Sequence, residues 1–270
     1  MSPSLFFHLV LVEAKKLMSY RVDFWITMVV ALVVNLVILW ALWEAIFAES
    51  GKELIGGWDL NGILAYGVMV FLTGRIVRGG DLQMTVATDI YDGALSRYLL
   101  YPRHYPFIKY AQQVGNILPD LFQSLMMGLV AIPLLGISTT ADVTPLSLLM
   151  AIPSILVAHL LFFLMSLTPQ YIAFWADNVW SLSVMLRFVT MLLGGAMLPL
   201  TLFPESIQVV LHWLPFSYLF EFPTLVALGK IDLLTWLEGI CYCLLWSLLI
   251  GLLSIPVWRR GDLRYTGVGI

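Results

Sequence analysis

The chain has 270 residues, of which 60% are hydrophobic and only 11% are charged, and its formal net charge is −3. A soluble domain is usually about half apolar and a quarter charged, so this composition excludes an ordinary soluble protein. The apolar runs are long and do not alternate with polar residues, which indicates membrane-spanning helices. We therefore expect an all-α integral membrane protein with a single transmembrane domain over residues 1–270.

The N-terminal residues 1–23 have the pattern of an amphipathic helix. Leu5 and Leu9 fall at helical spacing from one another, while Glu13 and Lys16 occupy other faces. Such a helix lies on a membrane surface, and its basic end suits an anionic leaflet.

Six apolar stretches approach the roughly 20 residues that are needed to cross the hydrocarbon. The expected spans are residues 24–47, 58–77, 117–136, 146–168, 179–200 and 239–258. Arg75, at the end of the second span, is expected to snorkel to the interface. Asp120 is expected in the first turn of the third span, where it suits the positive end of the helix dipole. His159, inside the fourth span, is interpreted as a packing and hydrogen-bonding residue.

Two polar residues are expected inside the bilayer. Asn35 lies at mid-depth in the first span, where it most simply bonds a neighbouring helix, with a substrate contact as the alternative. Arg187 lies about two turns into the fifth span, where an unpaired charge is costly. Either it is a functional charge or it snorkels to the interface.

Residues 204–232 are apolar but are interrupted by prolines, which also occur just before this stretch, so no straight span can run through it. We predict a re-entrant helical hairpin between spans five and six, built from half-length helices at Ser206–Leu214 and Phe216–Gly229. Irregular backbone at membrane depth survives only when it packs on protein or lines a wet cavity. The hairpin is either a lid over a path through the protein or a lipid-facing seal.

Most of the 14 Lys and Arg residues fall before the first span, within residues 75–109, or after the last span. The positive-inside rule then predicts that both termini and the segment 78–110 are cytoplasmic, and that the hairpin is on the outer side. The segment 78–110 is charged, is expected to break at Gly93, and is long for a connection in a compact bundle. Its length favours a docking function.

Recognisable chemistry is absent from the sequence. There is no Gly-rich phosphate loop followed by Lys-Ser or Lys-Thr, no HExxH, no paired-cysteine metal spacing and no aspartate-rich cluster. No basic patch indicates nucleic-acid binding. We therefore expect no catalytic residues, no metal site and no enzyme activity in this chain.

Three stretches together resemble the membrane subunit of ABC-2-type ATP-driven exporters, and the resemblance covers nearly the whole chain. They are Ser19–Phe24 before the first span, Ile90–Pro102 after the second, and Gly195–Lys230 with its Leu-Pro and Phe-Pro-Glu turns. The order, spacing and sidedness of the three stretches carry the resemblance.

The resemblance implies a six-span permease in a bacterial plasma (inner) membrane, working as a homo- or heterodimer on a separate cytoplasmic ABC ATPase subunit. ATP and Mg would be held by that partner, so no cofactor is expected in this chain. The family's coupling segment would correspond to 78–110, and the residues expected to act there are Asp89, Asp92, Gly93, Ser96 and Arg97.

Candidates for the translocation path are Asn35, Trp180, Arg187 and Phe216, although these aromatic residues also suit an interfacial belt. Two other classes remain open. An ion-gradient-driven secondary transporter would show inverted repeats and acidic residues at mid-membrane, and none is apparent. A non-transporting membrane scaffold or assembly factor would also need spans and a docking loop.

Overall fold

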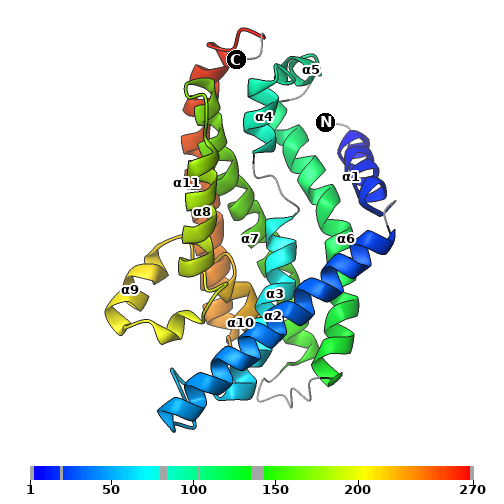
Figure 1. Cartoon of the computed structure of the whole chain (residues 1–270). Coiled ribbons are helices and arrows are strands. Elements are labelled where there is room, and N and C mark those ends of the chain that lie inside the picture. The colour runs from blue at the N-terminus through cyan, green and yellow to red at the C-terminus, as the bar shows by residue number, and fades with distance from the viewer. Residues whose placement is uncertain (1–2, 19–20, 80–83, 102–103, 135–142, 268–270) are drawn as a thin grey trace.

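The computed structural model describes residues 3–18, 21–79, 84–101, 104–134 and 143–267. Over these ranges the chain forms helices and no strand (Figure 1). The helices are α1 (Pro3–Met18), α2 (Arg21–Ser50), α3 (Leu60–Arg78), α4 (Thr85–Tyr91), α5 (Leu95–Leu99), α6 (Tyr105–Leu134), α7 (Pro145–Gln170), η1 (Tyr171–Phe174), α8 (Trp180–Leu193), η2 (Leu200–Leu202), α9 (Glu205–Trp213), α10 (Glu221–Ala227) and α11 (Leu233–Asp262).

Four helical segments of the described chain are long and apolar enough to cross a membrane. They are Trp25–Ser50, Leu60–Arg78, Pro145–Phe174 and Leu233–Asp262, which correspond to the first, second, fourth and sixth predicted spans. The prediction of an all-helical integral membrane protein is therefore confirmed. The count of six spans stays a prediction, because α6 is not among the four and α8 has only 14 residues.

Helix α3 forms the centre of the bundle. In the most apolar stretch of α3, 72% of the residues are buried. The corresponding shares are 11% in α2 and 17% in α11. Helix α3 packs against α2, α6, α7 and α10. Helices α2 and α11 expose rows of aliphatic side chains, which suit contact with lipid or with another membrane helix.

The start of α6 corrects the prediction for Asp120, which forms an ion pair with α3. Helix α6 begins at Tyr105, well before residue 117, so Asp120 lies in the helix interior and not in a first turn. Its Oδ1 accepts a hydrogen bond of 2.7 Å from Arg75 Nη2, which also donates to Gln123 Oε1 at 3.3 Å. Helix α6 therefore supplies a counter-charge for Arg75, while its position at the membrane interface stays a prediction.

Helix α1 packs along α6. Val10 and Ala14 are buried, and the absence of a side chain at Gly115 lets the backbone of α1 approach α6 closely at Val10. Phe7 and Leu11 remain exposed on another face. The sequence thus folds into the expected helix, while its position on the membrane surface stays a prediction.

The N-terminus, the C-terminus, α4 and α5 all lie at the same end of the bundle (Figure 1). This is the relative sidedness that the distribution of Lys and Arg predicts. That this end faces the cytoplasm is not tested by the fold.

Two short helices, α9 and α10, occupy the proline-interrupted stretch, and α10 lies inside the bundle against α3 and α7. Phe220 and Thr224 are fully buried. The preceding turn is fastened to the core, because Glu221 N donates to Gly194 O at 2.9 Å and Tyr66 Oη donates to Gly195 O at 2.6 Å.

Gly195 provides a test of this close approach. Its φ is +80°, and a Cβ there would lie 2.7 Å from Glu221 Cβ and 2.8 Å from Tyr66 Oη. Gly57 has a similar φ of +84° but nothing within 4 Å. Left-handed strain alone costs about 1–2 kcal/mol, and overpacking adds about 1–3 kcal/mol.

We therefore expect Gly195→Ala to lower the free energy of unfolding by about 2–5 kcal/mol, against about 1–2 kcal/mol for Gly57→Ala. Equilibrium unfolding of the purified variants in detergent measures both. Equal losses would show that the contacts around Gly195 do not constrain the turn.

Candidate functional site

The segment between α3 and α6 forms two short helices joined by a tight turn. Helix α4 ends at Tyr91, and Gly93 takes a φ of +69°, which favours glycine because it has no Cβ. Helix α5 follows at Leu95–Leu99. The structure thus places the turn between α4 and α5 at the glycine where the sequence predicts a break.

The inner face of α4–α5 is anchored on α7 and η1. Val86, Ala87, Ile90 and Leu95 are completely buried or nearly so. Gln170 Oε1 at the end of α7 accepts hydrogen bonds from Val86 N at 3.0 Å and Ala87 N at 3.4 Å. These bonds satisfy backbone donors at the start of α4 that no helical carbonyl can reach.

Asp89 ties α4 to α6. Its Oδ2 lies 2.6 Å from Lys109 Nζ and accepts a hydrogen bond of 2.6 Å from Tyr105 Oη. Burial raises the pKa of the Tyr105 hydroxyl, and Asp89 raises it further. The hydroxyl therefore stays protonated and donates a hydrogen bond to the carboxylate. Lys109 also lies 4.7 Å from the centre of the Tyr98 ring. The Asp89 side chain is therefore occupied within the protein.

Ser96 is also engaged internally, since its N donates to Tyr265 Oη at 3.2 Å and its Oγ lies 3.0 Å from the same oxygen. This bond joins α5 to the chain that follows α11. Of the five residues predicted for coupling, only Asp92 and Arg97 have exposed side chains.

The exposed tip of this segment continues into apolar residues that the sequence reading did not select. Leu100 is 87% exposed, Tyr101 58% and Leu99 46%. We call Asp92, Arg97 and Leu99–Tyr101 the coupling tip. Three successive large apolar residues after a charged stretch were the available signal, but the sequence does not reveal whether they are buried.

The candidate path residues do not meet in one cavity of the described chain. Trp180 begins α8 and is 60% exposed, while Phe216 lies in the turn after α9 near the other end of α8. Arg187, between them, lines a cavity of about 20 Å³ together with Gln170 and Thr190. Such a volume holds about one water molecule. Asn35 lies on an exposed face of α2.

His159 is a core residue, as the sequence predicts. Its Nδ1 lies 2.9 Å from Val77 O at the end of α3, and its ring stacks on Tyr110. Gln113 Nε2 donates to the next carbonyl, Arg78 O, at 2.9 Å. These two side chains satisfy carbonyls at the end of α3 that have no helical partner.

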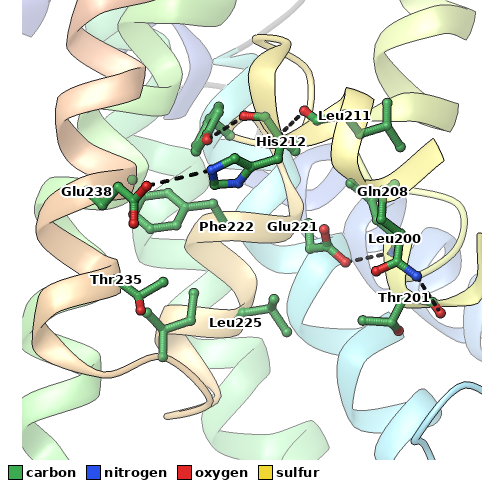
Figure 2. A pocket seen from close by; sticks show the side chains of 14 residues that line it. Leu200, Thr201, Gln208, Leu211, His212, Glu221, Phe222, Leu225, Thr235 and Glu238 are labelled. Carbon is green, nitrogen blue, oxygen red and sulfur yellow. Dashed lines mark hydrogen bonds and ion pairs between the residues drawn. The ribbon is translucent and has the colours of Figure 1, made fainter. Parts of the chain in front are cut away.

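Glu221 is the buried carboxylate at the start of α10. Its Oε1 accepts a hydrogen bond of 2.6 Å from Leu200 N, and the residue is only 8% exposed (Figure 2). The sequence reading missed Glu221, and its signal was an isolated acid in an otherwise apolar stretch.

The described chain is thus a helical membrane domain with an anchored helical turn at one end and a broken helical segment in its other half. The chain belongs to the ABC-2 family of transporter proteins, since that family's model matches residues 23–269. No curated protein and no solved structure matches it.

The Asp89–Lys109 pair generates a stability prediction. Lys109→Met leaves Asp89 charged in a site where its side chain is only 14% exposed. Breaking a buried pair in this way costs about 3 kcal/mol or more. Thermal unfolding should show this loss, and the double variant Lys109→Met with Asp89→Asn should recover part of it.

The exposed Asp92 serves as the control, because Asp92→Asn is expected to change stability by less than about 0.5 kcal/mol. Hydrogen exchange of the α4 amides should accelerate in Lys109→Met and not in Asp92→Asn. Unchanged exchange in both would mean that the ion pair does not hold α4 on α6.

Proposed function

We propose that this chain is the membrane-spanning subunit of an ATP-driven exporter, and that it couples through the segment 78–110 to a separate cytoplasmic ABC ATPase. Membership of the ABC-2 family supports the permease role. The observation that carries the coupling assignment is the coupling tip, which is exposed at its end while its base is fixed to α6, α7 and the chain that follows α11.

The chemistry of the coupling tip suits a protein partner. Leu100 and Tyr101 offer apolar surface, and Asp92 and Arg97 flank it with one charge of each sign. Protein interfaces combine a buried apolar centre with a polar rim, and Tyr and Arg are enriched among the residues that contribute most to binding. A partner that pulls on the coupling tip would move its anchoring helices as well.

The six-span arrangement is part of the proposal. Helix α6 has 30 residues and is about 45 Å long at 1.5 Å per residue, which is long enough for a third span. Helix α8 is about 21 Å long, so the fifth span would be completed by the non-helical residues after Gly194. The burial of α10 against α3 and α7 supports a re-entrant hairpin.

A second copy of the permease is the proposed partner of α2. The middle of this helix exposes Val33, Val34, Val37 and Ile38 beside Asn35. Within the described chain Asn35 has no hydrogen-bond partner. A bare amide in hydrocarbon is unfavourable, whereas an amide from a facing helix would satisfy it. A related permease chain could fill the same place.

The coupling assignment predicts that Asp92→Lys, Arg97→Glu and Leu100→Asp each abolish stimulation of the co-purified ATPase by the permease in proteoliposomes. The substituted side chains are exposed, so the thermal stability of each variant should stay within about 0.5 kcal/mol of the parent protein. ATP hydrolysis with and without the permease measures the effect.

Matched controls lie in the exposed loop at the opposite end of the bundle, where Lys52→Glu and Leu54→Asp make the corresponding changes. They should leave stimulation intact. Normal stimulation in all three coupling-tip variants would refute the assignment. Cargo movement without ATP would instead favour a gradient-driven transporter.

The dimer contact predicts that Asn35→Leu weakens self-association in lipid bilayers. Polar contacts between membrane helices average about 0.6 kcal/mol and reach about 1.7 kcal/mol, which corresponds to roughly threefold to twentyfold in the dissociation constant. Single-molecule photobleaching at decreasing protein-to-lipid ratios measures this change. Asn35→Gln keeps an amide and should lose less, while equal association of all three proteins would exclude Asn35 from the contact.

A further inference from the structure

A cavity of about 210 Å³ opens between η2, α9, α10 and the start of α11 (Figure 2). It lies away from the coupling tip, in the half of the bundle that contains α9 and α10 (Figure 1). Leu211, Phe222 and Leu225 provide apolar walls, while Glu221, Glu238 and His212 provide charged or ionisable groups. None of the described residues that line it is Lys or Arg.

One carboxylate oxygen of Glu221 is hydrogen-bonded to the protein, and the other is available to a ligand in the cavity. Oε1 is held by Leu200 N, and the second oxygen turns away from Leu200 (Figure 2). Among the described residues this second oxygen has no hydrogen-bond partner. The carboxylate is nevertheless enclosed, since the residue is only 8% exposed. Because Glu221 also lines the cavity, its second oxygen can accept a hydrogen bond from a ligand there.

Glu238 supplies a second carboxylate from α11. Its Oε1 lies 3.6 Å from His212 Nε2, and both side chains are about half exposed. His212 offsets the charge of Glu238 only when it is protonated. With a neutral histidine, the cavity holds two acidic side chains and no fixed positive charge in its lining.

We propose that this cavity binds an organic cation, specifically a primary ammonium group carried on a short apolar body. An ammonium has three donors, which suit the free oxygen of Glu221, while Glu238 adds a negative charge on the α11 wall of the cavity. The apolar body would contact Phe222 and Leu225. The described residues form no cluster of three metal-ligating side chains, so the arrangement does not suit a chelated metal. The inference concerns binding alone and does not depend on ATP-driven transport.

The test uses the chain in phosphatidylcholine nanodiscs. The nanodiscs are titrated with n-hexylammonium and, separately, with 1-hexanol, which is a neutral probe of similar shape. Calorimetry, corrected with empty nanodiscs, should show saturable binding of the ammonium only. Glu221→Gln keeps an oxygen to accept from Leu200 N but removes the charge, so it should weaken binding about tenfold or more. Glu238→Gln should also weaken it.

Glu205→Gln is the matched control, because Glu205 is an exposed carboxylate on α9 that does not line the cavity. It should bind as the parent protein does. If Glu221→Gln does not fold, Glu238→Gln and the neutral probe still decide the question. Equal binding of both probes, or hexylammonium affinity unchanged by the cavity substitutions, would overturn the proposal.

Adding phosphatidylethanolamine to the nanodiscs separates two sources of the ammonium group. The lipid headgroup is identified as an occupant if phosphatidylethanolamine competes with hexylammonium for the parent protein. This competition should be absent in a cavity variant that still binds hexylammonium. Saturable binding without competition would identify free amines. Both results support an ammonium site, and failure of ATPase coupling would leave either result unchanged.

Discussion

Backbone groups that leave a helix inside a bilayer must find partners within the protein, because the hydrocarbon offers none. In the proposed re-entrant arrangement, three of the hydrogen bonds made by the chain between α8 and α10 serve this purpose: Glu221 N to Gly194 O, Tyr66 Oη to Gly195 O, and Leu200 N to Glu221 Oε1. Helices α3 and α10 supply the side chains, so the broken segment is fastened to the centre of the bundle.

Glu221 has two roles in this arrangement. One oxygen closes the turn before α9, and the other is available to the cavity beside α11. A positively charged occupant of the cavity would therefore contact a residue that also shapes the turn.

The two ends of the molecule share the same long helices. Near its start α11 contacts α7, where Trp236 Nε1 donates to Ser154 Oγ at 2.9 Å. Towards its end Trp258 stacks on Tyr105 of α6, at 5.1 Å between ring centres. Helix α7 likewise packs on α10 and ends at Gln170, which caps α4. Packed side chains and rigid helices of this kind can carry energetic coupling between distant sites.

The sequence predicts features that follow from local chemistry. The prolines of 199–223 predict interrupted helices, and Gly93 predicts a break between two helices. Length and hydropathy predict six spans, of which four are found as long apolar helices. Features that depend on tertiary pairing could not be predicted. The local sequence around Asp120 suits a helix start, but α6 begins at Tyr105. The ion-pair partner of Asp120, Arg75, lies 45 residues away in the chain.

The candidate site shows the same division. Charge and length single out the segment 78–110, but they do not distinguish Asp89, which is held by Lys109, from Asp92, which is exposed. Both are acids on a short helical stretch, and only the packing of α4 on α6 separates an internal tie from a surface residue. The sequence likewise does not distinguish Leu100, which is exposed, from a leucine of the core.

The most direct test of the account is to purify the chain from its native host in mild detergent and to identify the bound proteins by mass spectrometry. The account predicts a stoichiometric ATPase subunit with a nucleotide-binding loop, together with a second copy of this chain or a related permease. Repeated recovery of the chain alone, without any ATPase, would contradict it.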